Sequence, residues 1–151
     1  MTLDESLNRI VGHLDLDYFF AQVEEVENPS LKNLPVVVCV YSGRTQDSGV
    51  VSTANYVARG YGVKSAIPIV LAKKKLEGTP AAFIPLNHEK YELVSERVME
   101  ILRSHVDVVE QTGIDEAYFD ITRGSQSDYR KASNLGSEIK RDILTAETLT
   151  C

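Results

Sequence analysis

Two adjacent carboxylates, Asp115 and Glu116, stand in the segment GIDEAYFD between two apolar, strand-like runs. The run VDVV at 106–109 precedes them and the run AYFDI at 117–121 follows, so Gly113 is predicted to mark a hairpin turn with both acids at its tip. A divalent ion needs hard oxygen ligands that converge from at least two places in the chain. We therefore expect a partner acid at the end of another strand.

Asp15 meets that expectation, because the apolar run RIVGHLDL at 9–16 contains it and the helical segment YFFAQVE follows directly. If this strand lies beside the hairpin, three carboxylates surround one or two ions. Two such ions can bridge the attacking and leaving oxygens of a displacement at phosphorus. Asp17 is predicted to cap the following helix rather than bind metal. Spacing alone leaves open an ordinary strand-end Asp15 and a solvated Asp-Glu turn.

The elements around these acids predict an α+β fold. Besides the strand at 9–14 and the hairpin, the pattern predicts a helix at 17–26, strands near 36–40, 49–53 and 81–85, short helices at 54–60 and 68–76, and a long helix at 88–104. A last helix carries Ala132, Leu135, Ile139 and Ile143 at helical spacing. Without residues 16–80 as an insertion, the order is strand, helix, strand, strand, helix. That order is a ferredoxin-like split βαβ unit that lacks its last strand.

Four segments together resemble the Y-family of translesion DNA polymerases, of the DinB-like, DNA polymerase IV type and its archaeal branch. They are DLDYFFAQVEE at 15–25, PVVVCVYSGR at 35–44, STANYVARGYGVKSAIPI at 52–69 and GIDEAYFD at 113–120. The resemblance implies that residues 1–15 begin the palm domain, that 16–80 form a small inserted α+β fingers subdomain, and that 81–151 are the rest of a palm whose last strand is truncated. It also implies DNA synthesis across damaged templates, by nucleotidyl transfer from a dNTP to a primer 3′-hydroxyl.

The resemblance implies that Asp15, Asp115 and Glu116 are the catalytic, metal-ligating carboxylates, with the backbone carbonyl of Leu16 as a further ligand. The expected cofactor is a pair of Mg²⁺ ions. Carboxylate ligands accept Mn²⁺ as well.

The resemblance also implies a nucleotide site. Phe20 falls where the family places its steric gate against a ribose 2′-hydroxyl, and the alternative is a core aromatic packed with Val23. The triphosphate is expected to meet the side chains of Thr53, Tyr56 and Arg59 and the backbone amides of Tyr18 and Phe19. Without the family, Thr53 is a candidate helix cap, and Tyr56 with Arg59 is a surface pair one helical turn apart.

Four small residues match the family's roof over the nascent base pair. Taken from sequence alone, ordinary strand packing is the favoured interpretation of these four, which are Val40, Val50, Ser52 and Ala66.

Composition fits one compact core, with 151 residues, 43% apolar and 25% charged. No run of about 18 apolar residues occurs, and the N-terminus MTLDESLN lacks an apolar signal region, so a cytoplasmic location without membrane contact is expected. Cys39 and Cys151 have no metal-binding spacing, and no chemistry is assigned to the three histidines, of which His105 is expected to meet free carbonyls at a helix end.

The net charge of −6 argues against a nucleic-acid partner, but its distribution softens that objection. Residues 41–80 sum to +4 and the remainder to −10. A basic lobe beside an acidic one suits a nucleotide-handling enzyme.

Leu149-Thr150-Cys151 resembles the start of the palm's last strand. In the family, the rest of that strand, a triphosphate-binding lysine, the thumb and the little-finger domain follow, and none of them is in these 151 residues. The expected partners are a dNTP and primer-template DNA, and any sliding-clamp contact is expected through those further parts. We expect weak activity at most from the chain alone, and self-association through its unpaired sheet edge. Two alternatives stay open: a nucleotide cyclase with a related palm, and a non-catalytic nucleotide-binding or partner-docking module.

Overall fold

The computed structural model describes residues 8–151, and residues 1–7, on which part of the predicted lack of a signal region depends, lie outside the described residues. The chain divides into two units. The first comprises the chain up to Asp17 together with Glu92–Cys151, and the second comprises Tyr18–Tyr91. The predicted domain limits at 15/16 and 80/81 remain a prediction.

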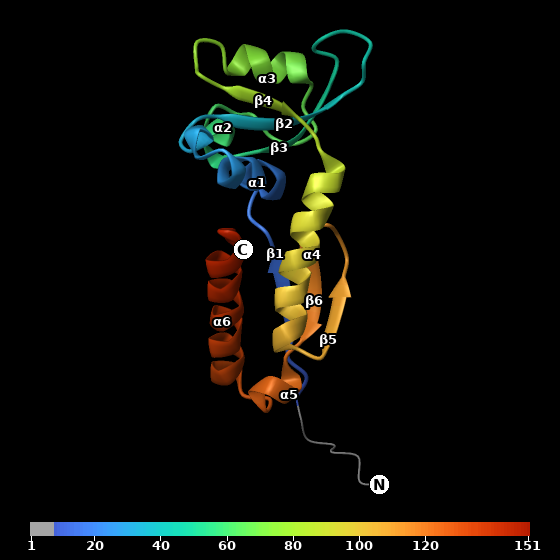
Figure 1. Ribbon diagram of the computed structural model, residues 1–151, viewed down its shortest axis with the longest axis vertical. Helices are drawn as coiled ribbons and strands as arrows, with labels where there is room; N and C mark the ends of the chain where they lie inside the picture. Colours follow the sequence, from blue (N-terminus) through green and yellow to red (C-terminus); the bar gives the residue numbers. More distant parts are fainter. Residues whose placement is uncertain (1–7) are drawn as a thin grey trace. The chain divides into compact units, whose positions relative to one another are not determined.

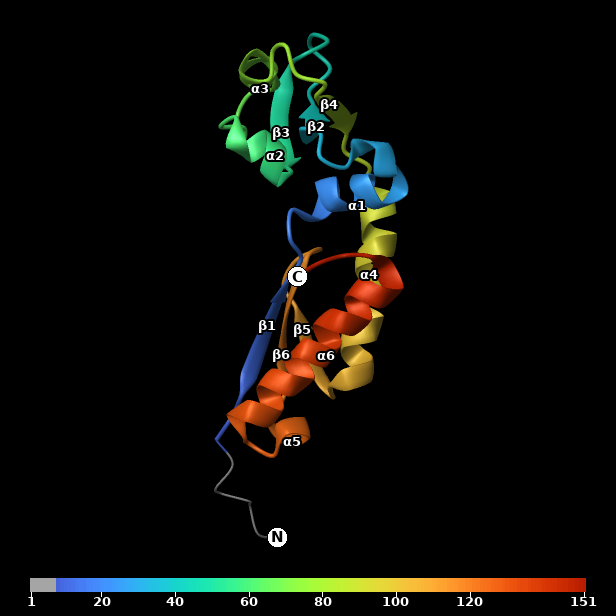
Figure 2. The ribbon, with the colours of Figure 1, turned by 90° about the vertical axis from the view of Figure 1, so that its left-hand side faces the viewer.

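The first unit contains a three-stranded antiparallel sheet in the order β1-β6-β5. Its strands are β1 (Val11–Asp15), β5 (Val108–Gln111) and β6 (Glu116–Asp120). Helices α4 (His88–His105) and α6 (Tyr129–Glu147) lie on one face of this sheet, and the short helix α5 (Thr122–Ser125) precedes α6 (Figure 1, Figure 2). The predicted order of strand, helix, strand, strand, helix is confirmed.

Alternation along the strands explains why only one face of this sheet is covered. Leu14, Ala117 and Phe119 are buried, whereas Val11 and Tyr118 are 51% and 46% exposed. A period of two places the first set toward the helices and the second set on an open face. The register pairs Asp15 with Glu116 on that open face.

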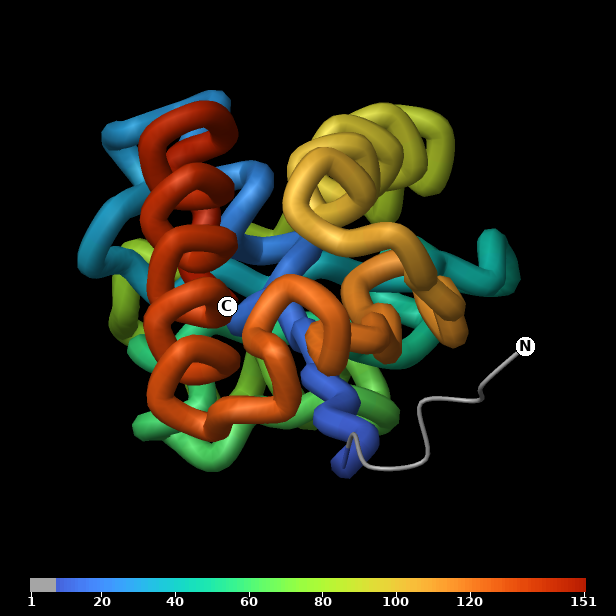
Figure 3. Tube along the Cα trace, turned by 90° about the horizontal axis from the view of Figure 1, so that it is seen from below, coloured from blue at the N-terminus to red at the C-terminus, as the bar shows by residue number. Residues whose placement is uncertain are grey.

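Two polar side-chain contacts join α4 to α6, which lie side by side on one face of the sheet (Figure 3). Arg97 Nη2 lies 2.9 Å from Glu147, and His105 Nε2 lies 2.9 Å from Asp142. His105 does end α4 as predicted, but its imidazole meets this carboxylate.

The second unit contains a mixed sheet in the order β3-β2-β4. Its strands are β2 (Val36–Tyr41), β3 (Gly49–Ala54), antiparallel to β2, and β4 (Ala82–Pro85), parallel to β2. The sequence grouped β4 with 81–151, whereas it pairs in this second sheet. The helices are α1 (Phe19–Glu27), the 3-10 helix η1 (Pro29–Leu31), α2 (Tyr56–Gly60) and α3 (Ile69–Lys75).

Both faces of β2 are covered, since the consecutive residues Val36, Val37 and Val38 are all fully buried. Figure 1 shows α3 on one side of the sheet and α1 on the other. The core on one side joins Val37 and Val51 to Ile69 of α3.

Asp17 does not cap α1, and that prediction is wrong. The cap position belongs to Tyr18, whose left-handed backbone (φ 31°) separates Asp17 from the helix. Asp17 instead accepts a hydrogen bond from Thr150 Oγ1 at 2.6 Å and donates its N–H to the Thr150 carbonyl at 3.1 Å. A long-range partner therefore outweighs the local capping preference.

Within residues 8–151, β1 pairs with β6 on one side and with no assigned strand on the other. Self-association through this edge stays a prediction. In the same part of the chain no helix is both long and apolar enough to cross a membrane.

Candidate active site

The hairpin between β5 and β6 holds Asp115 in a turn tied to α4. Ser95 of α4, 2% exposed, donates to the Ile114 carbonyl, and Gln111 Nε2 donates to the Gly113 carbonyl at 3.0 Å. The Asp115 carbonyl accepts the Leu16 N–H at 2.9 Å, which joins the turn to the end of β1. The turn is therefore fixed on both sides, as a site that needs defined geometry requires.

Glu116 is the first residue of β6 rather than part of the hairpin tip, and side chains contact both of its carboxylate oxygens. Thr112 Oγ1 donates to Oε1 at 3.2 Å, and His13 Nε2 lies 3.3 Å from Oε2. The His13 ring also packs against Tyr118 at 4.5 Å between centroids. The sequence assigned no chemistry to His13, although its position two residues before Asp15 places both on one face of β1.

The structure brings Asp15, Asp115 and Glu116 together, as predicted. Asp15 and Glu116 are cross-strand neighbours, and Asp115 immediately precedes Glu116. Burial raises the pKa of Asp115, and the nearby charges of Asp15 and Glu116 raise it further. Three carboxylates that repel one another at one place are stabilised by a bound cation.

The donor set fits a hard divalent ion, since it consists of three carboxylates and the carbonyl of Leu16. No group of three or more His, Cys, Asp or Glu side chains within residues 8–151 is already gathered as a metal cage.

In the second unit, Asn55 is the N-cap of α2, the helix that carries Tyr56 and Arg59. Its Oδ1 accepts from the backbone N–H groups of Ala58 and Val36, both at 3.0 Å. Its Nδ2 donates to Glu25 Oε1 and to the Leu34 carbonyl, both at 2.7 Å. The sequence considered Thr53 as the cap. Thr53 lies in β3, and the Asn directly before the helix was the available signal.

Tyr18, Tyr56 and Arg59 form one polar-aromatic group. The rings of Tyr18 and Tyr56 meet edge to face at 4.9 Å, and the Arg59 guanidinium lies 5.1 Å from the Tyr56 ring centre. Arg59 Nε donates to the Ala54 carbonyl at 2.8 Å. This bond restrains the side chain and does not use the two terminal nitrogens of the guanidinium. Tyr56 is 59% exposed, so the group is open to a ligand.

Phe20 is half-buried and so differs from the fully buried Phe19 beside it. Its ring stacks on Tyr91 at 4.4 Å with 17° between planes. Phe20 thus packs on Tyr91 and is partly exposed, and both the gate role and the alternative of a core aromatic packed with Val23 stay predictions.

The favoured interpretation of the four small residues as packed strand residues does not hold for Val40, Val50 and Ala66, which are exposed. Val40 and Val50 are 46% and 44% exposed, Ala66 is exposed and Ser52 is half-buried. Val40 and Val50 face each other in the register of β2 and β3. Ala66 has a left-handed backbone (φ 71°), which is costly for a residue with a Cβ.

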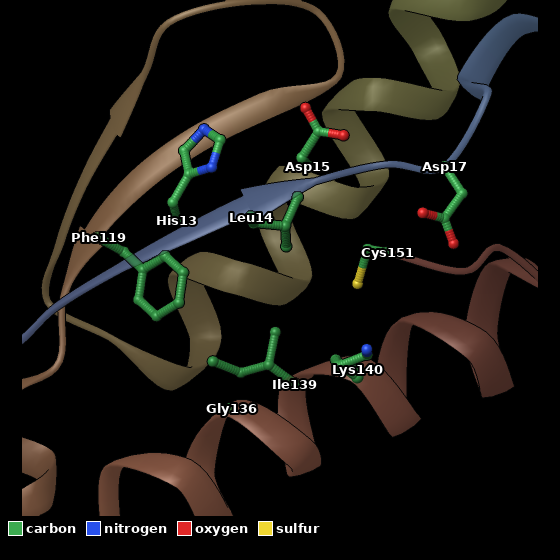
Figure 4. Close-up of a pocket in the computed structure, with 9 residues that line it drawn as sticks. All are labelled: His13, Leu14, Asp15, Asp17, Phe119, Gly136, Ile139, Lys140 and Cys151. Carbon is green, nitrogen blue, oxygen red and sulfur yellow. The ribbon is translucent and has the colours of Figure 1, made fainter. Parts of the chain in front are cut away.

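A cavity of about 420 Å³ lies between β1 and α6 (Figure 4). Leu14, Phe119 and Ile139 give it an apolar lining, and Lys140 and Cys151 also line it. In Figure 4 the Asp15 and His13 side chains point to the opposite side of β1 from Leu14. The carboxylate site therefore uses the open face of the sheet, and this cavity lies behind it.

Comparison with known proteins gives one consistent result. Residues 14–151 match the impB/mucB/samB family (IMS). The chain is similar to DNA polymerase IV of Saccharolobus solfataricus P2, with 56% identity over 141 residues that cover 93% of this chain and 39% of that protein. It is also 50% identical over 144 residues to DNA polymerase IV of Nitrosopumilus maritimus, covering 95% of this chain and 40% of the relative.

Solved structures agree. A Y-family DNA polymerase chimera of Dbh and Dpo4 superposes with a TM-score of 0.89 at 46% identity, over 93% of this chain and 40% of the chimera. An insertion ternary complex of Dbh DNA polymerase gives a TM-score of 0.87 at 46% identity, with the same coverage of both chains. The chain thus spans about 40% of the length of these relatives.

Proposed function

Because the chain belongs to the impB/mucB/samB family, we propose that it supplies the palm and fingers of a DNA polymerase that copies damaged templates. The reaction is attack of a primer 3′-oxygen on the α-phosphorus of a dNTP, which forms a phosphodiester bond and releases pyrophosphate. Primer-template DNA and the dNTP are the partners. The relatives are longer, so the chain alone is expected to extend primers weakly at most.

Asp15, Asp115 and Glu116, with the Leu16 carbonyl, would hold two Mg²⁺ or Mn²⁺ ions. The ions, when bound, lower the pKa of the 3′-hydroxyl and neutralise charge on the attacking and leaving oxygens. The three carboxylates supply the negative charge that retains the ions, and β1 and the hairpin fix where that charge lies. The meeting of these acids at the paired ends of β1 and β6 is the observation that carries the proposal.

Residues of the second unit would hold the nucleotide. The Arg59 guanidinium and the hydroxyls of Tyr56 and Thr53 donate to triphosphate oxygens, and the backbone amides of Tyr18 and Phe19 at the start of α1 add to this set. Arg59 can do so without losing its stem contact, because only its Nε is used by the Ala54 carbonyl.

Phe20 would reject the ribose 2′-hydroxyl by steric contact. Val40, Val50, Ser52 and Ala66 would lie over the nascent base pair. The four side chains are small, and those of Val40, Val50 and Ala66 are exposed. This supports the role, because a roof of that kind encloses a distorted base pair loosely and tolerates damage.

Calorimetric titration of dATP into the 151-residue chain with Mg²⁺ tests the proposal. We expect metal-dependent binding that weakens about tenfold or more in Asp115→Asn. The matched control is Asp107→Asn, which removes a carboxylate that is 75% exposed and paired with an exposed Arg123. Affinity in that control should equal wild type.

Binding that is absent, independent of metal, or equal in the two variants would contradict the assigned site. Formation of a cyclic nucleotide from the triphosphate would point to a cyclase instead.

A further inference from the structure

The surroundings of Phe20 single out a residue that the sequence did not connect with the nucleotide site. Tyr91, at the first turn of α4, is completely buried and stacks on the Phe20 ring at 4.4 Å. Phe19, 2% exposed, approaches the same ring at 5.5 Å with 46° between planes. Phe20 is thus a partly open ring backed by two buried ones.

Tyr91 is itself anchored through its hydroxyl. It donates to Glu24 Oε1 at 2.6 Å, and Lys90 Nζ lies 2.7 Å from the same oxygen. Lys90 also lies 2.8 Å from Glu27, so one ammonium joins two carboxylates of α1. Glu24 is 7% exposed, and charge-assisted bonds at such a buried site are strong and restrict motion.

The spacing of residues on α1 explains why one tyrosine can contact both Phe20 and Glu24. Phe20 and Glu24 are four residues apart, so they lie on the same face about 6 Å apart along the helix axis. Tyr91 therefore lies along α1, with its ring on Phe20 and its hydroxyl on Glu24.

We infer that Tyr91, held by Glu24, is a positioning residue that fixes the Phe20 ring and thereby determines how strictly the site rejects ribonucleotides. The inference depends on the gate role of Phe20 in the proposed function. A steric gate works only if its ring cannot retreat, because a retreat of about 1 Å gives room to one hydroxyl. The stack blocks that retreat on one face of the ring.

The test compares ATP and dATP affinities of the 151-residue chain with Mg²⁺ by calorimetry. We expect wild type to favour dATP by up to about 10²-fold, the ceiling for rejecting one added hydroxyl by shape. Phe20→Ala should bring the ratio near unity. Tyr91→Leu should lower the ratio about tenfold through tighter ATP binding, with dATP affinity kept within about twofold. Tyr91→Phe keeps the ring and loses the hydroxyl anchor. Its ratio of dATP to ATP affinity should lie between those of wild type and Tyr91→Leu.

The direction of change separates positioning from general damage, since loss of structure weakens both nucleotides whereas loss of positioning strengthens ATP alone. Tyr129→Leu, at an exposed tyrosine of α6, serves as the control and should match wild type. If Phe20→Ala leaves the ratio unchanged, the gate itself fails. If Phe20→Ala abolishes selectivity while both Tyr91 variants retain it, the gate stands and the positioning role is refuted. Should Tyr91→Leu fail to fold, Tyr91→Phe decides alone.

Discussion

Replacement of Asn55 by alanine should be among the most damaging single changes in the second unit. Asn55 is 2% exposed, and its four hydrogen bonds use both amide hydrogens and both oxygen lone pairs. They join the N-terminus of α2 to β2 and, through Glu25, to α1.

The magnitude follows from those four bonds. At about 1 kcal/mol for each neutral bond, and about 2 kcal/mol for the one to the Glu25 carboxylate, the expected loss is about 4–5 kcal/mol. Relative to a total stability of about 5–15 kcal/mol, this is a large fraction. In urea the unfolding midpoint should fall by about 2 M, since the slope for a small protein is about 1–3 kcal/mol per molar.

Asn28→Ala is the matched control, because it makes the same chemical change at an exposed cap. Asn28 Oδ1 accepts from the Ser30 N–H at 3.2 Å and from its hydroxyl at 2.6 Å. Its loss should cost about 1 kcal/mol or less. Asn55→Ser should fall between the two, because serine keeps a capping oxygen and lacks the two amide donors.

Equilibrium urea unfolding followed by far-UV circular dichroism measures all three variants. If Asn55→Ala costs no more than Asn28→Ala, the bridging role of Asn55 is refuted. If Asn55→Ser equals wild type, only the helix cap matters and the bonds to Glu25 and Leu34 contribute nothing.

Three further changes have defined outcomes. Gly12→Ala should lower stability by about 1–3 kcal/mol, because its Cβ would lie 2.2 Å from Cζ of Phe119. Gly136→Ala, with no atom near its Cβ, should be neutral or stabilising. Equal unfolding midpoints of the two variants would contradict this. Ala66→Gly should raise stability by about 1 kcal/mol in urea unfolding, because it removes the strain of a left-handed alanine, and a loss would show that the strain is absent. Asp115→Asn should raise the melting temperature at pH 7. The folded-state pKa of Asp115 is raised, so its ionised form opposes folding above the unfolded pKa of about 4 and the gain should vanish below that pH. Solvent screening limits the gain to a few degrees in calorimetry, and a drop at pH 7 would refute the reasoning.

The carboxylate site was accessible to sequence analysis because its signals are local. The apolar alternation around Asp15 and around Asp115-Glu116 fixes which side chains share a face, and the short hairpin fixes the pairing of its strands. The three carboxylates then meet if the two strands that carry them are neighbours in the sheet. That arrangement is confirmed by the register of Asp15 with Glu116.

What the sequence did not reveal depends on partners far away in the chain. The hydroxyl of Tyr91 meets Glu24 across 67 positions, and Asn55 meets Glu25 across 30. The contact of Asp17 with Thr150 spans 133 positions and overrides a capping preference worth about 1 kcal/mol. Such contacts require the tertiary fold, and spacing within a motif carries no information on them.

The division of the chain has a consequence for its biosynthesis. The second unit is one continuous stretch, 18–91, whereas the first joins β1 to strands that follow a whole unit later. At about 5–20 residues per second, Asp15 leaves the ribosome roughly 5–20 s before the Glu116 with which it pairs. The second unit is therefore fully synthesised before the partner strand of β1 is made. The three carboxylates therefore cannot come together until the hairpin that carries Asp115 and Glu116 has been synthesised.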